Sequence, residues 1–244
     1  RIDNWTIEKY NERFEIIYER FLQIWEYPKV IIPETNSNTE QNIFVADSLN
    51  HRVLIWTSLP VGNNENADNV LGQPDFVTNT EINPPTASSL QVPIAVHFDG
   101  TKLYVTSNDD SRVMIWNTLP GSDNDPADVV VGQSDKITGI PNYNGVSSRS
   151  LSGPQNITEA DGRLFVSDYL NHRVTVWDSV PTSDASTSLY VIGQDSMRTG
   201  SENRGTSTTA NSRGLDGPTA VAVQSNKLWI VDRENNRLVR YQLP

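Results

Sequence analysis

The stretch Asp168-Tyr-Leu-Asn-His-Arg-Val-Thr-Val-Trp177 sets the architecture of this chain, because it is one of four versions of the same phrase. The nearest copy reads Asp47-Ser-Leu-Asn-His-Arg-Val-Leu-Ile-Trp56. The four versions align on one arginine each, at spacings of 60, 61 and 64 residues: Arg52, Arg112, Arg173 and Arg237. Repetition at a regular spacing indicates one supersecondary unit that is stacked several times. The sequence therefore predicts a single repeat domain.

Each unit predicts four short strands. A proline opens the first apolar segment of three units, and Asp-Gly pairs at 99–100 and 161–162 separate it from the second, which is a strong signal for an antiparallel hairpin. The third run, as in 53–56, is apolar on both faces, and the fourth, as in 130–133, ends in Gly-Gln. Strands that are buried on both faces need sheets stacked on either side, so the unit is interpreted as a propeller blade.

A polar corner lies between the second and third strands. Three carboxylates stand five residues before the repeat arginine: Asp47, Asp168 and Asp232. A tight turn brings carboxylate and guanidinium together, and the asparagine that follows each carboxylate suits such a turn. We therefore predict a structural Asp–Arg pair in three units. The second unit has Ser107 at this place, and Asp109 or Asp110 is expected to substitute.

These corners resemble the NHL repeat, and the Gly-Gln strand with its long connections is similar to the bacterial NHL-type arrays. The resemblance covers about residues 43–244. It implies a β-propeller, most often six-bladed in the family. It also implies functions that range from protein and RNA binding to a few metal-dependent lyases and hydrolases, so the fold alone does not settle the function.

The expected fold is all-β: a β-propeller of about four NHL-like four-stranded blades, with an N-terminal α-helix. The units lie at about 29–90, 91–151, 152–214 and 215–244. The fourth stops before any Gly-Gln strand, and the first lacks a Pro-led inner strand unless residues 28–32 supply it. Because unpaired strand edges are normally covered, three closures stay open: a ring closed by an N-terminal strand, pairing with a second chain, or membership of a longer array.

Residues 1–28 lie outside the repeat and predict an amphipathic helix with its lead-in. Apolar side chains recur at spacings of three and four from Ile7 to Ile24, and Tyr27-Pro28 ends the pattern. Like charges at a spacing of four weaken this helix in isolation, so it needs a partner surface. It either covers a face or edge of the propeller or forms a homo-oligomer contact through a short coiled-coil seam.

The composition of the chain limits the classes of partner and of site that we expect. The 30 acidic and 19 basic residues give a formal net charge of −11. Such a surface repels phosphate backbones and anionic membranes, so we expect no nucleic-acid partner. No run of 18 apolar residues is present, so we expect no membrane span. The absence of cysteine removes disulfides, zinc–cysteine sites and thiol nucleophiles.

The three histidines predict no metal site. His51 and His172 occupy equivalent corner positions, which favours a role in the turn. His97 lies in the inner strand of the second unit and is a tentative binding residue, because inner strands line the channel of a propeller. A lone histidine without converging carboxylates is not a zinc or iron site. The oxygen-rich loops 63–68 and 122–128 leave calcium open as a cofactor, although neither has EF-hand spacing.

The long connections 78–91, 136–153 and 195–217 occupy the same place in each unit, so they are expected to gather on one face. The last contains three further tentative binding residues: Arg198, Arg204 and Arg213. Such a cluster suits a carboxylate-bearing partner or an acidic glycan. The alternative is a solvated, flexible loop.

No motif of a serine hydrolase, nucleotide-binding loop or zinc protease is present, and no catalytic residue is assigned. The leading expectation is a non-enzymatic binding or scaffold module that engages a protein or extracellular matrix partner through its loop faces. Such a protein is expected to be secreted or on the cell surface. The alternatives are a metal-dependent lyase or hydrolase that uses the channel, and a structural subunit of a surface assembly.

Overall fold

The computed structural model describes residues 29–31, 42–205 and 209–243. The helix that the sequence predicts within residues 1–28 lies outside them. The helical elements of the described part are three short 3-10 turns, η3 (Ser48–Asn50), η4 (Tyr169–Asn171) and η5 (Glu202–Gly205). None of these is long and apolar enough to cross a lipid bilayer.

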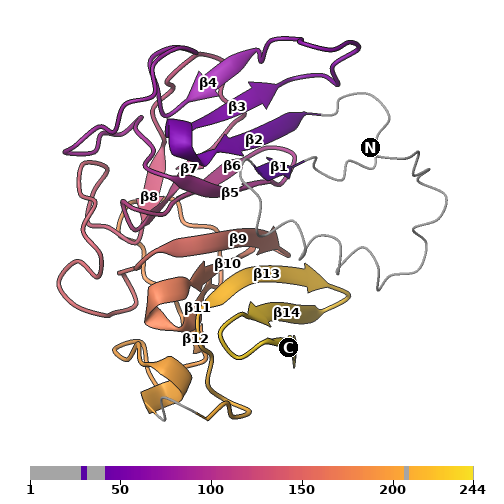
Figure 1. The fold of residues 1–244 in the computed structure, drawn as a ribbon. Helices are drawn as coiled ribbons and strands as arrows, with labels where there is room; N and C mark the ends of the chain where they lie inside the picture. Colours follow the sequence, from indigo (N-terminus) through magenta and orange to yellow (C-terminus); the bar gives the residue numbers. More distant parts are fainter. Residues whose placement is uncertain (1–28, 32–41, 206–208, 244) are drawn as a thin grey trace.

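The described residues form four antiparallel sheets that follow one another along the chain (Figure 1). Sheet 1 consists of β1 (Lys29–Ile31), β2 (Ile43–Asp47), β3 (Arg52–Trp56) and β4 (Asn69–Leu71). Sheet 2 consists of β5 (Pro93–Phe98), β6 (Leu103–Ser107), β7 (Arg112–Trp116) and β8 (Val129–Val131). Strand β1 pairs with β2, so residues 29–31 do supply the inner strand of the first unit.

Sheet 3 consists of β9 (Pro154–Ala160), β10 (Arg163–Asp168), β11 (Arg173–Trp177) and β12 (Tyr190–Ile192). Sheet 4 has three strands, β13 (Pro218–Gln224), β14 (Lys227–Asp232) and β15 (Arg237–Gln242). The strand order within each sheet is sequential, as in propeller blades. The chain is therefore all-β, with β-propeller-like repeated sheets.

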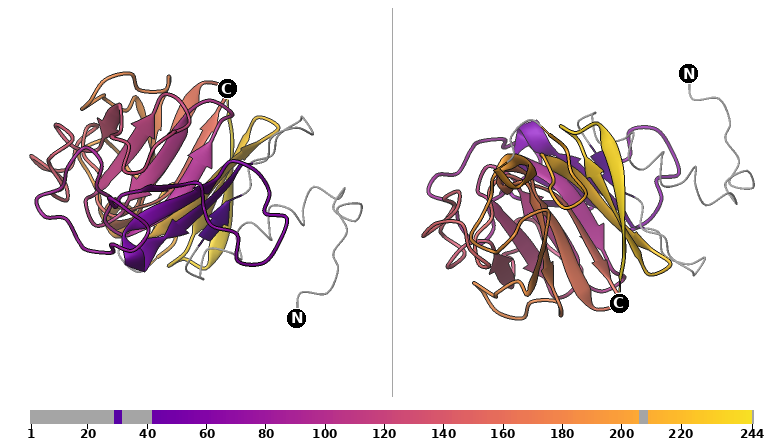
Figure 2. Two further views of the ribbon diagram at one scale, coloured as in Figure 1. Left: turned by 90° about the horizontal axis from the view of Figure 1, so that it is seen from above. Right: turned by 90° about the horizontal axis from the view of Figure 1, so that it is seen from below.

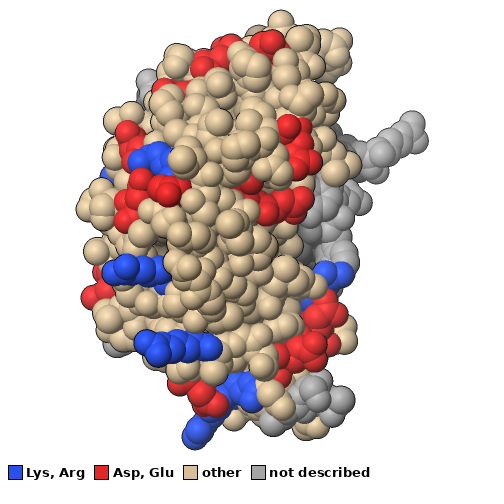
Figure 3. All heavy atoms as spheres, turned by 90° about the vertical axis from the view of Figure 1, so that its left-hand side faces the viewer, with Lys and Arg blue, Asp and Glu red and all other residues tan. Residues whose placement is uncertain are grey.

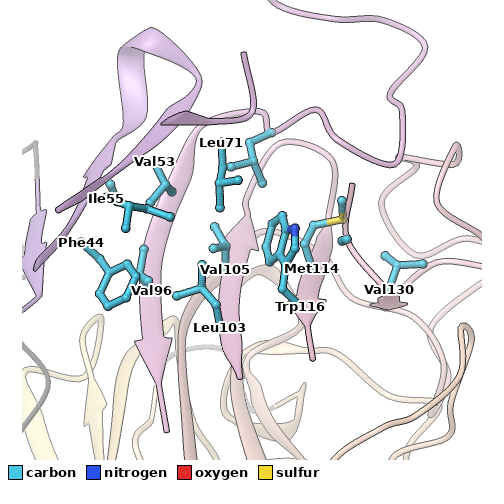
Figure 4. Close-up of a cluster of buried hydrophobic side chains, with 13 residues drawn as sticks. Phe44, Val53, Ile55, Leu71, Val96, Leu103, Val105, Met114, Trp116 and Val130 are labelled. Atoms are coloured by element: carbon cyan, nitrogen blue, oxygen red, sulfur yellow. The ribbon is translucent and has the colours of Figure 1, made fainter. Parts of the chain in front are cut away.

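Consecutive sheets pack face to face in chain order. Each sheet has an aromatic side chain three residues before the corner carboxylate position: Phe44, Tyr104, Phe165 or Trp229. We call the face of the sheet that bears this side chain the front face, and the opposite face the back face. Phe44 and Ile55 on the front of sheet 1 share a core with Leu103 and Trp116 on the back of sheet 2 (Figure 4). The innermost strands β5, β9 and β13 lie side by side (Figure 2). The stack thus has three cores, one at each junction between sheets.

Burial separates the two middle sheets from the two end sheets. Strands β6, β7 and β11 are buried at every residue, whereas β3 and β15 alternate. The prediction that residues 53–56 are buried on both faces was therefore wrong for Leu54 and Trp56, which are half-buried. The reason is positional, because within the described residues no sheet stacks on the back of sheet 1 or on the front of sheet 4.

The hairpins between the first two strands differ from one another in their turns. Asp161 and Gly162 both have positive φ, as a two-residue turn of this kind requires. At the equivalent place only Gly100 has positive φ. Asp99 instead accepts hydrogen bonds from the backbone N–H groups of Thr101 and Lys102, so this loop is two residues longer than the sequence indicated.

Candidate functional site

The corners and the long connections lie at the same end of every sheet. Each third strand runs away from its corner and the fourth strand returns, so the next connection starts beside the corner. This end, which we call the loop face, comprises the corners 48–51, 108–111, 169–172 and 233–236 and the connections 72–92, 132–153, 193–205 and 209–217. It lies on the left in Figure 1 and toward the viewer in Figure 3.

Each corner contains an ion pair. Arg173 Nε donates to Asp168 Oδ2 over 2.7 Å, and both side chains are fully buried. The equivalent pairs join Arg52 to Asp47 over 2.8 Å and Arg237 to Asp232 over 2.6 Å. The corner asparagine donates to the same carboxylate, as Asn171 does over 2.8 Å. The corner is therefore a closed hydrogen-bond network.

The second corner reaches the same result with different residues. Ser107 stands at the carboxylate position, and its hydroxyl donates to Asp110 Oδ2 over 2.9 Å. That carboxylate in turn lies 3.1 Å from Nη2 of the buried Arg112. Of the two substitutes that the sequence offered, Asp110 thus pairs with the arginine.

The buried corner carboxylates need a neighbouring cation to stay charged at low cost. Burial raises the pKa of Asp168, and the positive charge of Arg173 opposes that rise. Burial likewise raises the pKa of Asp110, which Arg112 again opposes. A buried carboxylate that loses its cation becomes strongly unfavourable. The corner pairs are therefore structural groups rather than exposed reactive ones.

The repeat arginines of the two middle sheets, Arg112 and Arg173, also anchor the connections on both sides of their sheets. Arg173 donates to the backbone oxygen of Met197, which lies in the following connection, over 2.8 Å. It donates to those of Ser147 and Ser150, in the preceding connection, over 2.9 and 2.8 Å. Arg112 repeats the pattern toward residues 136 and 86–89. One buried guanidinium thus fixes two long loops at once.

The Gly-Gln strand ends supply a second anchor that sequence reasoning missed. Gln133 Nε2 donates to the carbonyl oxygens of Asp110, Ser111 and Ile140 at 3.0–3.2 Å. Gln194 bonds in the same way to residues 172 and 201. The signal was the recurrence of Gly-Gln at one position in three units, which a strand alone does not require. These glutamines fasten the start of each connection to the corner beside it.

We expect Gln133→Ala to lower the free energy of unfolding by about 1–3 kcal/mol, because the carbonyl oxygens of the buried Asp110 and Ser111 and that of Ile140 lose their donor. Hydrogen exchange should also accelerate at residues 134–142, and mass spectrometry after deuterium labelling measures both effects. Gln242→Ala is the control, since Gln242 is exposed and should change stability by less than about 0.5 kcal/mol. Equal protection of residues 134–142 in wild type and Gln133→Ala would contradict the anchoring role.

Apolar side chains stand exposed on the loop face. They are Leu49 and Leu170 at the corners and four residues of the connections: Phe76, Val77, Ile137 and Ile140. In Figure 3 the charged side chains lie mostly toward the margins of this face, and the centre is uncharged. Exposed apolar groups on one face make that face a candidate contact site.

The structure only partly gathers the tentative binding residues. Arg198 and Arg213 are exposed in the connection before sheet 4, and Arg204 forms an ion pair with Asp195 of the same connection. A shallow pocket beside them is lined by His172, Gly200, Ser201, Glu202 and Gly205. The fourth candidate, His97, is remote from this connection in the fold: it lies on β5 with its ring 5.6 Å from that of Tyr104.

The corner histidines accept hydrogen bonds across the junctions between sheets. His172 adopts the left-handed conformation, and its Nδ1 accepts the N–H of Gly217 over 3.1 Å at the start of the next sheet. His51 makes the equivalent contact with Val92 over 3.4 Å. Asp216 also lies 2.9 Å from Nδ1 of His172. Within the described part of the chain, no three histidine or acidic side chains are grouped so that they could hold a metal ion.

The two oxygen-rich loops use their carboxylates as hydrogen-bond acceptors for backbone groups. Asp68 accepts the N–H of Thr57 over 2.7 Å, and Asp128 accepts that of Asn117 over 2.7 Å. Asp123 accepts the N–H of Val70 in the preceding sheet over 3.0 Å. Both loops lie at the end of the molecule opposite the loop face, and the loop 122–128 ties sheet 2 to sheet 1 there.

No protein-family model matches the chain, and no curated protein sequence matches it. Among solved structures it is similar to the computationally designed Ika4 protein, with 8% identity, a TM-score of 0.48 and coverage of 90% of this chain and 94% of that chain. It is similar to a chain of the nidogen/laminin complex, with 16% identity, a TM-score of 0.49 and coverage of 83% and 55%. It is also similar to the streptogramin B lyase structure, with 11% identity, a TM-score of 0.42 and coverage of 89% of this chain and 59% of that chain.

The chain thus spans little more than half the length of the last two chains. All three TM-scores lie below 0.5, and these likenesses assign no activity, ligand or partner to this protein. The repeated sheets are established by the strand pairing of the chain itself.

Proposed function

We propose that this chain is an NHL-like β-propeller array whose loop face binds a protein partner without catalysis. The observation that supports the proposal is the double anchoring of the connections by Arg112 and Arg173. Long loops usually lose conformational entropy when they bind, and this cost opposes affinity. Loops whose backbone is already fixed by buried side chains avoid much of that cost. The loop face is therefore suited to recognition.

The surface of this face favours a protein rather than a polyanion. Its exposed connections present Val77, Ile137 and Ile140, which a partner can cover with apolar side chains of its own. Arg198 and Arg213, both exposed in the last connection, can pair with acidic groups of that partner. The formal net charge of −11 opposes a nucleic acid.

The test is a selection of binders from a phage-displayed library of random peptides on the immobilised full chain. The variant Val77→Asp/Ile137→Asp replaces side chains that are 87% and 66% exposed. We expect it to weaken the selected peptides by at least about tenfold, because a carboxylate is costly to desolvate against an apolar partner. Biolayer interferometry gives the affinities.

The matched control is Leu59→Asp/Val61→Asp, which makes the same change at the opposite end of the molecule. Those side chains are 45% and 99% exposed. Peptide affinity should stay at the wild-type value, and both double variants should keep the wild-type melting temperature. An equal loss in the two double variants, or no enrichment over an inert protein, would contradict the proposed binding face.

A further inference from the structure

The chain contains three copies of one sheet-to-sheet junction. In each, the front face of one sheet packs on the back face of the next. Phe44, Tyr104 and Phe165 stand at the same place in the repeat and are each buried in such a junction. The repeat therefore encodes two complementary surfaces, a front that receives the next sheet and a back that receives the preceding one.

The front face of sheet 4 has the residues of a junction but no sheet upon it within the described residues. Trp229 stands at the position of Phe165 and is only half-buried. Leu238, at the position of the fully buried Val174, is 44% exposed. Val231 pairs across the strands with Leu238 and is half-buried as well. An aromatic and two aliphatic side chains thus remain available on this sheet.

The back face of sheet 1 supplies the complementary half. Ile43 pairs with Trp56, and Val45 pairs with Leu54; all four are half-buried. Their equivalents on sheet 2, including Leu103 and Trp116, are buried against sheet 1. The two end faces of the chain therefore match the two sides of the junctions inside it.

Charge supports the same pairing. Arg240 lies on the front of sheet 4, with its guanidinium carbon 5.9 Å from the centre of the Trp229 ring, and takes the place of the buried Val176. Inside the chain, the loop after the third strand reaches back to the preceding sheet, as Asp184 does when it accepts the N–H of Val130. The equivalent loop of sheet 1, residues 57–68, has Asn63 at the place of Asp184 and contains the acidic Glu65 and Asp68. A sheet 1 placed on sheet 4 brings this acidic loop toward Arg240.

We propose that the front face of sheet 4 binds the back face of sheet 1 of a second copy of this chain. The contact is head-to-tail, so it uses two different surfaces and leaves one of each on the assembled pair. It repeats between chains the junction that the sheets make within one chain. Trp229 and Leu238 fill the centre, and Arg240 meets the acidic loop at the margin.

The test measures the mass of the full chain by sedimentation equilibrium over a concentration series. We expect the wild type to exceed the mass of one chain. Leu238→Asp on sheet 4 and Leu54→Asp on sheet 1 should each weaken association by at least about 30-fold, because each puts a carboxylate in the centre of the junction. Leu189→Asp, an equally drastic change at a side chain that is 57% exposed just before the outer strand of sheet 3, should leave the mass at the wild-type value.

Mixing the two variants gives the decisive measurement. Leu238→Asp keeps an intact sheet 1 and Leu54→Asp keeps an intact sheet 4, so the mixture can rebuild one junction and should form a species of two chains. Circular dichroism must show that both variants are folded. If one is not, Leu238→Ser replaces Leu238→Asp, or Leu54→Ser replaces Leu54→Asp. A monomeric wild type would mean that another part of the same chain covers these faces and would overturn the proposal. A mixture that stays monomeric would overturn it as well.

Discussion

Arg173→Ala is expected to lower the free energy of unfolding by about 3–5 kcal/mol, because the substitution leaves a buried carboxylate without its cation. Both Arg173 and Asp168 have no exposed side-chain surface. The variant also removes the donor for the carbonyl oxygens of Met197, Ser147 and Ser150, so two connections lose their shared anchor. Urea denaturation followed by tryptophan fluorescence measures the change.

Arg52→Ala is the matched control for this prediction, since it removes the same repeat position from a more exposed corner. The side chains of Arg52 and Asp47 are 17% and 18% exposed. Water therefore solvates the remaining carboxylate in part, and we expect a smaller loss of about 1–2 kcal/mol. The double variant Asp168→Ala/Arg173→Ala should lose less than the sum of its two single changes. A wild-type urea midpoint for Arg173→Ala would show that the buried pair is not structural.

Gly132→Ala is expected to lower the free energy of unfolding by about 2–5 kcal/mol, through two separate costs. Gly132 has a φ of 94°, where a side chain costs about 1–2 kcal/mol. An added Cβ would also lie 2.7 Å from Leu151 Cδ1 and 2.9 Å from the backbone oxygen of Ser111. Crowding of a packed site costs about 1–3 kcal/mol more. Thermal unfolding followed by circular dichroism measures the sum.

Gly100→Ala separates the two costs, because Gly100 has nearly the same backbone conformation in open space. Its φ is 96°, and no heavy atom lies within 4 Å of an added Cβ. Gly100→Ala should therefore lower the free energy of unfolding only by the conformational cost, about 1–2 kcal/mol. If both alanine variants lost the same free energy of unfolding, the contact of the added Cβ at residue 132 with Leu151 would carry no cost of its own.

The sequence predicted some parts of the candidate site and missed others. The arginine corners were predictable, because a carboxylate and an arginine five residues apart across a tight turn have few other geometries to adopt. The glutamine anchor was missed, since its acceptors are backbone carbonyl oxygens, which every residue has and no pattern reveals. The loop arginines were grouped by proximity in sequence, whereas the structure pairs Arg204 with Asp195 and leaves Arg198 and Arg213 exposed.

The repeat determined, by itself, the strand order, the corners and the end at which the connections gather. These features depend on contacts within one unit, and each unit contains all the residues that make them. Tertiary structure alone decided which apolar faces are buried. Phe165 and Trp229 occupy the same place in the repeat, yet the first is buried and the second is half-exposed. Burial of a sheet face depends on the neighbouring sheet, and the residues of the face do not specify whether that neighbour exists.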